Sequence, residues 1–226
     1  MMLLGCIMKH DHVHGQGDVI RSPFIYDLML ALITRGREAA FRESILDHAR
    51  VASGERVLDV GCGTGTLALA AKRRVGAGGE VCGVDPSAEM IARGKSKAAR
   101  AGVTVNFDIA SAQKLPFPDH SFEVVLSSLM LHHLPEADRL QGVAEMRRVL
   151  KPAGRLMIVE LIQKPGLIRS LLPARLSHRH DHSHAFEDAK VLMKDAGFAE
   201  VASGAFRWRY AKWVLGAASN TIPSHA

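Results

Sequence analysis

The hydrophobic residues of this chain form short runs and longer periodic stretches that follow one another from about residue 55. Five short, mostly apolar runs predict buried strands, near residues 56–60, 80–84, 103–107, 122–127 and 155–161. Between them, segments with apolar residues at helical spacing predict helices near residues 66–75, 87–101 and 136–150. Strands that are apolar on both faces and alternate with helices are typical of a parallel sheet covered on two sides. The pattern therefore predicts an α/β fold.

Further elements are expected on both sides of this alternation. A polar, His-rich arm precedes a helix that begins at Ser22-Pro23 and ends at Gly36, and a second helix follows over about 37–50. After the alternation we expect a segment rich in Pro and His, a helix and two strands, over about 164–184, 186–196, 198–206 and 210–217. These regions divide the chain into 1–54, 55–161 and 162–226. Because 226 residues suit one α/β domain, all three are expected to belong to it.

The composition says more about the environment in which the protein works than about its function. No apolar run approaches the roughly 20 residues that a membrane-spanning helix needs. The odd set of cysteines, Cys6, Cys62 and Cys82, predicts a reducing cytoplasm without a disulfide framework. The net charge of +6 permits attraction to nucleic acid, but the Lys and Arg residues are scattered along the chain. A solvated basic surface is therefore the default interpretation.

The segment from Val57 to Gly65, VLDVGCGTG, carries the strongest functional signal. It indicates a buried strand, a glycine-rich turn and then a helix, an arrangement in which the backbone can approach a ligand closely. A dinucleotide-binding turn would place its third glycine at position 66, which is Thr66 here, whereas the glycine falls at Gly65. The spacing therefore argues against a nicotinamide or flavin dinucleotide.

This segment resembles the first motif of class I S-adenosylmethionine (SAM)-dependent methyltransferases. The resemblance continues through SAQKLPFPD at 111–119, through 121–134 with its Leu-His-His-Leu, and through the KPAGRL turn at 151–156. It covers roughly residues 55 to 160 and is nearest to small-molecule enzymes of the quinone C-methylating kind. The resemblance implies SAM as cofactor and a three-layer, Rossmann-like, seven-stranded sheet with a C-terminal antiparallel hairpin.

The resemblance also implies a set of cofactor residues at the carboxyl ends of the strands. Asp85 would accept the ribose hydroxyls, although it could also cap the following helix. Met90 would pack on adenine, although alone it would be assigned to the core. Ser111 stands where the family has Asp or Asn, and the Ala112 amide would donate to the adenine edge. The full set is Asp59, Gly61, Cys62, Gly63, Gly65, Asp85, Pro86, Met90, Ser111, Ala112, Ser127 and Ser128.

Two features leave alternatives open. His132 and His133 follow the fourth strand and are candidate bases for a hydroxyl acceptor, but one could instead cap the next helix while the other packs. The His-rich segments include His12, His14, His180 and His182, whose neighbouring Asp residues would suit zinc or nickel. Since no regular ligand spacing exists, a solvated loop or a polar lining of the acceptor pocket is favoured over a metal site.

The sequence therefore predicts a SAM-dependent methyltransferase that moves a methyl group by in-line displacement to an O, C, N or S atom of a small molecule. A cytoplasmic monomer or homodimer is expected. A nucleic-acid methyltransferase is the first alternative, although the stretch from Ser127 to Met130 differs from the Asn/Asp-Pro-Pro-aromatic motif of base-amino methylating enzymes. A non-catalytic SAM- or metal-binding regulatory protein is the second.

Overall fold

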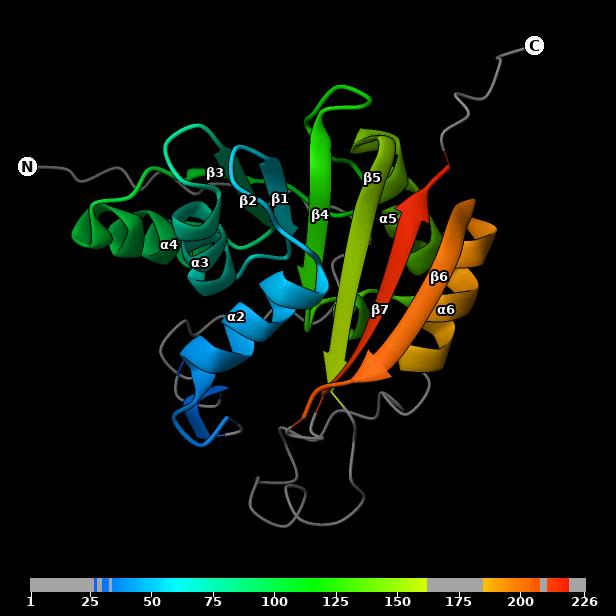
Figure 1. The fold of residues 1–226 in the computed structure, drawn as a ribbon, viewed down its shortest axis with the longest axis horizontal. Coiled ribbons are helices and arrows are strands. Elements are labelled where there is room, and N and C mark those ends of the chain that lie inside the picture. Colours follow the sequence, from blue (N-terminus) through cyan, green and yellow to red (C-terminus); the bar gives the residue numbers. More distant parts are fainter. Residues whose placement is uncertain (1–26, 28–29, 33, 162–184, 208–210, 220–226) are drawn as a thin grey trace, which may run out of the picture.

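The computed structural model describes residues 27, 30–32, 34–161, 185–207 and 211–219, and helices and strands alternate along them (Figure 1). The helices and one 3-10 turn are α2 Glu38–His48, α3 Thr66–Val75, α4 Ala88–Ala101, η1 Leu131–His133, α5 Glu136–Val149 and α6 Ala185–Asp195. The strands are β1 Arg56–Val60, β2 Glu80–Asp85, β3 Asn106–Ile109, β4 Phe122–Ser128, β5 Leu150–Leu161, β6 Phe198–Ala205 and β7 Ala211–Ala218. Among the described residues, no helix combines the length and the apolar character that crossing a bilayer requires.

The seven strands form one sheet in the order β3-β2-β1-β4-β5-β7-β6. Strands β1 to β5 pair in parallel, whereas β7 runs antiparallel to β5 and to β6. This confirms the predicted sheet and its C-terminal antiparallel hairpin. Because the parallel strands share one direction, their carboxyl ends meet at one edge of the sheet, where open α/β sheets bind ligands.

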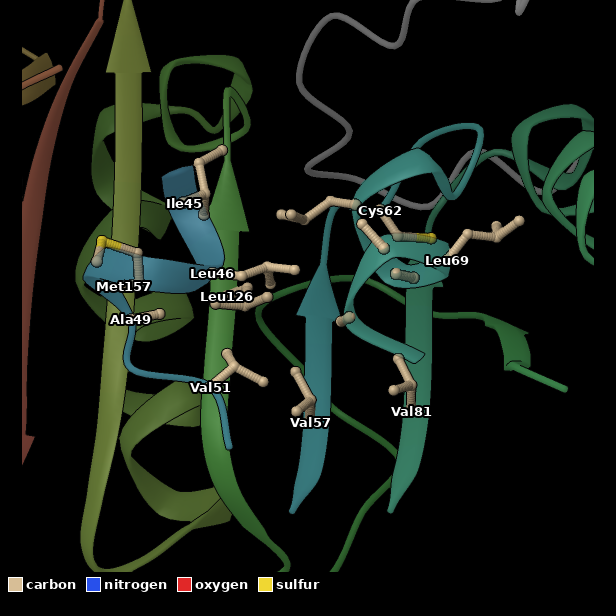
Figure 2. Close-up of a cluster of buried hydrophobic side chains, with 14 of the residues drawn as sticks. Ile45, Leu46, Ala49, Val51, Val57, Cys62, Leu69, Val81, Leu126 and Met157 are labelled. Carbon is tan, nitrogen blue, oxygen red and sulfur yellow. The ribbon is translucent and has the colours of Figure 1, made fainter. Parts of the chain in front are cut away.

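Helices cover both faces of the sheet and give it three layers (Figure 1). On one face, α2, α3 and α4 bury their apolar sides; Ile45 and Leu46 of α2 pack in one cluster with Leu126 of β4 (Figure 2). On the other face, Met146 of α5 and Met193 of α6 belong to a second buried cluster. The strands are buried from both sides, as their apolar sequences predict.

The third strand lies further along the chain than the sequence predicts. The range 103–107 is wrong: pairing with β2 begins only at Asn106, opposite Cys82. The reason lies in the end of α4. Gly102 takes a left-handed φ of 64°, and the amide of Val103 returns to the carbonyl of Ala98. Residues 103–105 are therefore used to close the helix before the strand can start.

The fifth strand begins earlier than the predicted residue 155. Leu150 pairs with Phe122, and the next pair on β4 and β5 is Val124 with Arg155, so four residues of β5 bulge between them. Ala153 in this bulge has a φ of 59°. The predicted KPAG turn is thus an irregularity inside β5, and α5 ends at Val149 instead of 150.

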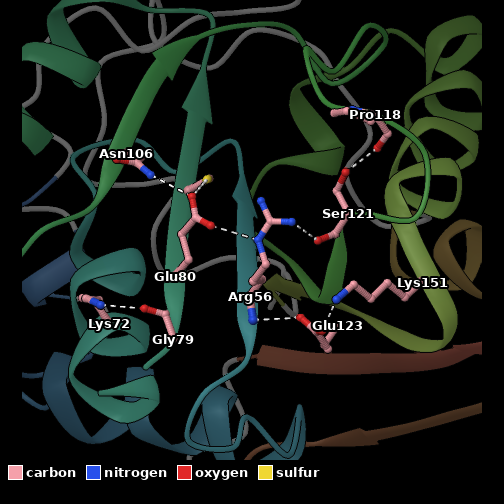
Figure 3. A network of polar contacts seen from close by, with 10 residues as sticks. Arg56, Lys72, Gly79, Glu80, Asn106, Pro118, Ser121, Glu123 and Lys151 are labelled. Atoms are coloured by element: carbon pink, nitrogen blue, oxygen red, sulfur yellow. Dashed lines mark hydrogen bonds and ion pairs between the residues drawn. The ribbon is translucent and has the colours of Figure 1, made fainter. Parts of the chain in front are cut away.

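Polar side chains link the amino ends of the strands, at the edge opposite to the glycine-rich turn (Figure 3). Arg56 Nε donates to Glu80 Oε2 over 2.9 Å, and its Nη1 donates to the Ser121 carbonyl oxygen over 2.8 Å. Glu123 accepts from the Arg56 amide over 2.8 Å and also pairs with Lys151. This edge is occupied by bonds between strands.

Candidate functional site

The turn after β1 is held against the end of β2 by its own backbone. The amides of Gly61 and Cys62 donate to the Val84 carbonyl oxygen over 2.8 and 2.9 Å. The next amide, that of Gly63, donates to Asp85 Oδ2 over 2.9 Å. The glycine turn and the predicted ribose carboxylate are therefore one connected unit.

The glycines of this turn are required by its backbone and by close packing. Gly61, Gly63 and Gly65 have φ angles of 70°, 53° and 77°, in a region that L side chains rarely adopt. A Cβ at Gly61 would lie 2.1 Å from Met130 Cγ, and one at Gly65 would lie 2.5 Å from Phe107 Cζ. In these two directions protein side chains, rather than a ligand, take the freed space.

Asp85 ends β2 with its carboxylate nearly buried, at 9% exposure. Oδ1 accepts from the Ser87 amide over 2.9 Å, and each carboxylate oxygen keeps a second lone pair for another donor. Burial raises the pKa of Asp85 above its ordinary value, against the hydrogen bonds from the amides of Ser87 and Gly63. The cap of α4 is Ser87, whose Oγ accepts from the Met90 amide, so Asp85 is not the capping residue.

Asp59 is a buried carboxylate near the carboxyl end of β1. It is 2% exposed, and its Oδ2 has no hydrogen-bond partner. Burial raises its pKa to about 7, while Arg42 acts to lower the pKa and Asp85 acts to raise it. A buried carboxyl oxygen without a partner is costly, and a cationic group placed beside it would remove that cost.

Arg42 of α2 points into the same region and is 4% exposed. Its Nη1 donates to Ser128 Oγ over 3.3 Å, its Nη2 lies 3.5 Å from Glu38 Oε1, and its Nε has no partner. The neighbouring Ser127 Oγ is also buried without a partner. Buried polar groups of both signs thus gather at the ends of β1 and β4, which is what a ligand carrying both charges requires.

The remaining predicted cofactor residues differ in their surroundings. Ser111 is exposed in a turn that the Lys114 amide closes on its carbonyl oxygen over 3.2 Å, and Ala112 is buried. Pro86 is exposed and Met90 is buried. Cys62 turns its thiol toward the core, where burial raises the pKa of the thiol well above its ordinary range. Its contribution at the edge is therefore its backbone.

His132 is paired with a buried carboxylate that the sequence does not predict. Its Nδ1 lies 2.6 Å from Glu160 Oε2, and Glu160 Oε1 accepts from the Leu131 amide over 3.0 Å. Glu160 is 2% exposed and lies near the carboxyl end of β5. The His133 ring packs against the His132 ring at an interplanar angle of 42°, with ring centroids 4.1 Å apart. Both histidines thus lie at the predicted edge of the sheet.

Two residues at this edge, Arg42 and Glu160, are missing from the sequence prediction. Glu160 did leave a signal, because it interrupts the apolar end of a strand in MIVEL. Arg42 left none, since one Arg in an amphipathic helix is normally assigned to solvent. Only the packing of α2 on β4 reveals its burial.

The minority metal candidates His12, His14, His180 and His182 lie outside the described residues. Within the ranges that the structure describes, no group of three or more His, Cys, Asp or Glu side chains is arranged to hold a metal. The structure also has a surface groove of about 520 Å³, and none of the predicted cofactor residues lines it. Its lining is Asp27, Glu38, Thr66, Leu69, Arg73, Lys97, Arg100 and Ala101.

Comparison with known proteins finds a family that matches most of the region around this edge. Residues 57–154 match the family described as "Methyltransferase domain". This part of the chain is therefore similar to known methyltransferase domains. The resemblance to class I SAM-dependent methyltransferases is thereby confirmed.

Relatives and solved structures agree with this assignment. The ubiquinone/menaquinone biosynthesis C-methyltransferase UbiE of Paraburkholderia phymatum is 39% identical over 135 residues, which are 60% of this chain and 55% of that protein. The UbiE protein of Bordetella avium is 37% identical over 142 residues, 62% of this chain and 55% of that protein. A SAM-dependent methyltransferase from Aquifex aeolicus shares the fold, with a TM-score of 0.65 and 21% identity over 87% of this chain and 98% of that one. The chain therefore spans about half the length of the curated relatives it matches.

The residues present at the carboxyl edge of the sheet fit SAM. SAM combines a sulfonium and an α-amine with a carboxylate, and the edge holds an unpartnered carboxyl oxygen of Asp59 beside the unpartnered Nε of Arg42. The helix α3 begins there without a side-chain cap and without an acidic residue in its first turn, which favours a carboxylate. Asp85 provides acceptor oxygens two strands away from Ser128, as a nucleoside needs.

Proposed function

We propose that this protein is a SAM-dependent methyltransferase that acts on a small molecule. The observation that carries the proposal is the gathering of the glycine turn, Asp85 and the buried, incompletely bonded Asp59 and Arg42 at one edge of a methyltransferase domain. A purely structural edge would satisfy its buried polar atoms internally, as the opposite edge does with Arg56 and Glu123.

Different residues at the edge would bind different parts of SAM. Asp85 would accept from the ribose hydroxyls, while Met90 and the loop at Ser111–Ala112 would face the adenine. Asp59 would lie near the positive groups of the cofactor and Arg42 near its carboxylate. Bound SAM supplies an activated methyl group, so these residues orient it and exclude water.

A small-molecule acceptor is favoured over nucleic acid. The relatives named above are C-methyltransferases, which supports a carbon atom as the methyl acceptor. Several basic side chains are already paired with carboxylates: Arg74 with Glu43 and Asp47, and Arg148 with Glu145. Charges held in this way are less available to a phosphate backbone.

The proposal also includes the domain organisation, the oligomeric state and the cellular compartment of the protein. We infer that 1–54 with its His-rich arm and cap helices, the SAM-binding core of 55–161, and 162–226 with its substrate-side insertion, last helix and terminal hairpin belong to one domain. We also infer that the protein works as a monomer or homodimer. The buried thiols of Cys62 and Cys82 are free, which supports a reducing compartment such as the cytoplasm.

Calorimetry with SAM and with NAD⁺ tests the proposal directly. We expect SAM to bind, NAD⁺ not to compete, and Asp85→Ala to weaken SAM binding by about tenfold or more, because the ribose would lose a charged acceptor. Asp195→Ala, which removes an exposed carboxylate at the end of α6, is the matched control and should bind as the unaltered protein does. Unchanged affinity in Asp85→Ala would refute the ribose contact, and NAD⁺ binding in the turn would refute the function.

A further inference from the structure

We propose that Phe107 is a positioning residue: its ring supports the end of the glycine turn, at Gly65, and thereby sets the place of the amino acid end of SAM. This inference rests on the proposed methyltransferase function. It adds to that function a buried residue of β3 that acts through the turn instead of touching the cofactor.

One edge of the Phe107 ring faces three glycines that come from three different elements. A Cβ at Gly65 of the turn would lie 2.5 Å from Cζ, one at Gly83 of β2 would lie 2.9 Å from Cδ1, and one at Gly94 of α4 would lie 3.2 Å from Cε1. The ring is buried, with 7% exposure. It therefore occupies the space that three side chains would otherwise fill.

Backbone geometry does not explain two of these glycines. Gly83 lies inside β2 and Gly94 inside α4, and neither has a positive φ. Glycine destabilises strands and helices relative to alanine, because it loses more conformational freedom on folding. What glycine supplies at both positions is room for the ring of Phe107.

The sheet fixes the place from which this ring acts. Phe107 lies opposite Gly83 in the parallel register of β3 and β2, so its ring can lean across β2 at the position where a side chain is missing. Across β2 the ring meets Gly65, and a Cβ at Gly83 would also lie 3.1 Å from Cys62 Sγ. The ring thus connects β3, the first strand in the order of the sheet, with the turn that follows β1.

Support from the ring matters most at the end of the turn. The amides of Gly61 and Cys62 bond the start of the turn to β2, whereas the Gly65 amide donates back to the Cys62 carbonyl oxygen over 2.9 Å, within the turn itself. Gly65 is also the N-cap of α3, so a shift of Gly65 moves the first amides of this helix. A carboxylate of SAM would be bound at those amides.

The adenosine end of SAM depends on other contacts. Asp85 ends a strand that is paired on both sides, and its carboxylate accepts from the Ser87 amide over 2.9 Å. Loss of the Phe107 ring leaves these bonds in place. A change at Phe107 should therefore weaken the binding of one part of the cofactor more than the other, which a general loss of stability would not do.

The experiment compares SAM with 5′-methylthioadenosine, which keeps the adenosine of SAM but lacks its amino acid end. By calorimetry on the full chain, well below its Tm, Phe107→Leu should weaken SAM binding about tenfold and 5′-methylthioadenosine binding less than about twofold, because the turn loses its support. Phe198→Leu is the matched control: Phe198 is 6% exposed, lies in β6 at the opposite border of the sheet, and faces Gly216, where a Cβ would lie 3.1 Å from Phe198 Cβ. It should lower Tm and leave both affinities unchanged.

A second substitution tests the contact between the ring and α4. Gly94→Ala alone should weaken SAM binding several-fold, because the added methyl group presses on the ring. Added to Phe107→Leu, the same change should bring SAM affinity back toward that of the unaltered protein, because it fills the space that the ring leaves.

The outcomes separate the inference from the proposed function. Equal losses for SAM and 5′-methylthioadenosine, or an unchanged SAM affinity in Phe107→Leu, would overturn the inference and leave the function standing. If Phe107→Leu does not fold, Gly94→Ala decides alone, and an unchanged SAM affinity in that variant overturns the inference. Absence of SAM binding in the unaltered protein would overturn the proposed function itself.

Discussion

At the scale of single residues, we expect Asp59 to couple cofactor binding to pH. Burial raises the pKa of its carboxyl to about 7, so at pH 7 about half of the free protein, and more of it at lower pH, holds a proton there that a cationic neighbour would displace. If SAM places its positive groups beside Asp59, binding must release this proton. SAM affinity should then rise with pH by up to about tenfold per unit below pH 7 and level off above it.

Calorimetry in buffers of different ionisation enthalpy measures the proton directly. Arg42 and Asp85 are the charged groups that shift the pKa of Asp59, and neither can take over the role of its carboxylate beside the cation of SAM. Asp59→Asn should therefore bind SAM without proton release and with a flat pH profile. A pH-independent affinity in the unaltered protein between about pH 5.5 and pH 7 would show that the cofactor's cation lies elsewhere.

At the scale of elements, a polar cluster joins the glycine turn to α4. Lys97 Nζ donates to Thr64 Oγ1 over 2.7 Å and to Asp27 Oδ1 over 3.0 Å, and Thr64 Oγ1 donates to the same Asp27 oxygen. Thr64 is 1% exposed and lies between Gly63 and Gly65. The shape of the turn thus depends on a lysine from another helix and on residue 27, which precedes α2.

Lys97→Met keeps most of the apolar stem and removes these donors. We expect it to weaken SAM binding several-fold and to cost about 1–3 kcal/mol of stability, because Asp27 and Thr64 lose their cationic partner and keep only the hydrogen bond between them. Lys95→Met on the same helix replaces an exposed lysine and should change neither value by a measurable amount. Equal SAM affinities in the two variants, by calorimetry, would show that the turn keeps its shape without Lys97.

The elements also show what sequence can predict. The turn from Gly61 to Gly65 and the carboxylate of Asp85 follow from local signals, because a buried strand, glycines with positive φ and a helix must occur in that order. Arg42 and Glu160 act across the fold, Arg42 on a serine of β4 and Glu160 on a turn that follows it. Such contacts depend on which strands become neighbours, and periodicity along the chain does not contain that information.

At the scale of the whole molecule, the two edges of the parallel sheet differ in how their polar groups are used. The amino edge joins strands through Arg56, Glu80 and Glu123, while the carboxyl edge keeps buried polar atoms of Asp59 and Arg42 without protein partners. Stability and ligand binding should therefore respond to different substitutions.

Thermal unfolding with and without S-adenosylhomocysteine separates the two edges. Arg56→Met should lower Tm without ligand by only about 2–5 °C, because the ion pair that it removes, with Glu80, is half exposed and screened by solvent. It should leave the ligand-induced gain in stability unchanged. With ligand at 100 times its Kd that gain is about 2.7 kcal/mol, and a tenfold weaker Asp85→Ala would keep only about 1.4 kcal/mol at the same concentration. If Arg56→Met instead lost the ligand-induced gain, the sheet would transmit strain between its edges and the separation of work would be wrong. The parallel pairing of β1 with β2 and β4 makes that outcome unexpected, since the strands between the edges are fully bonded and buried.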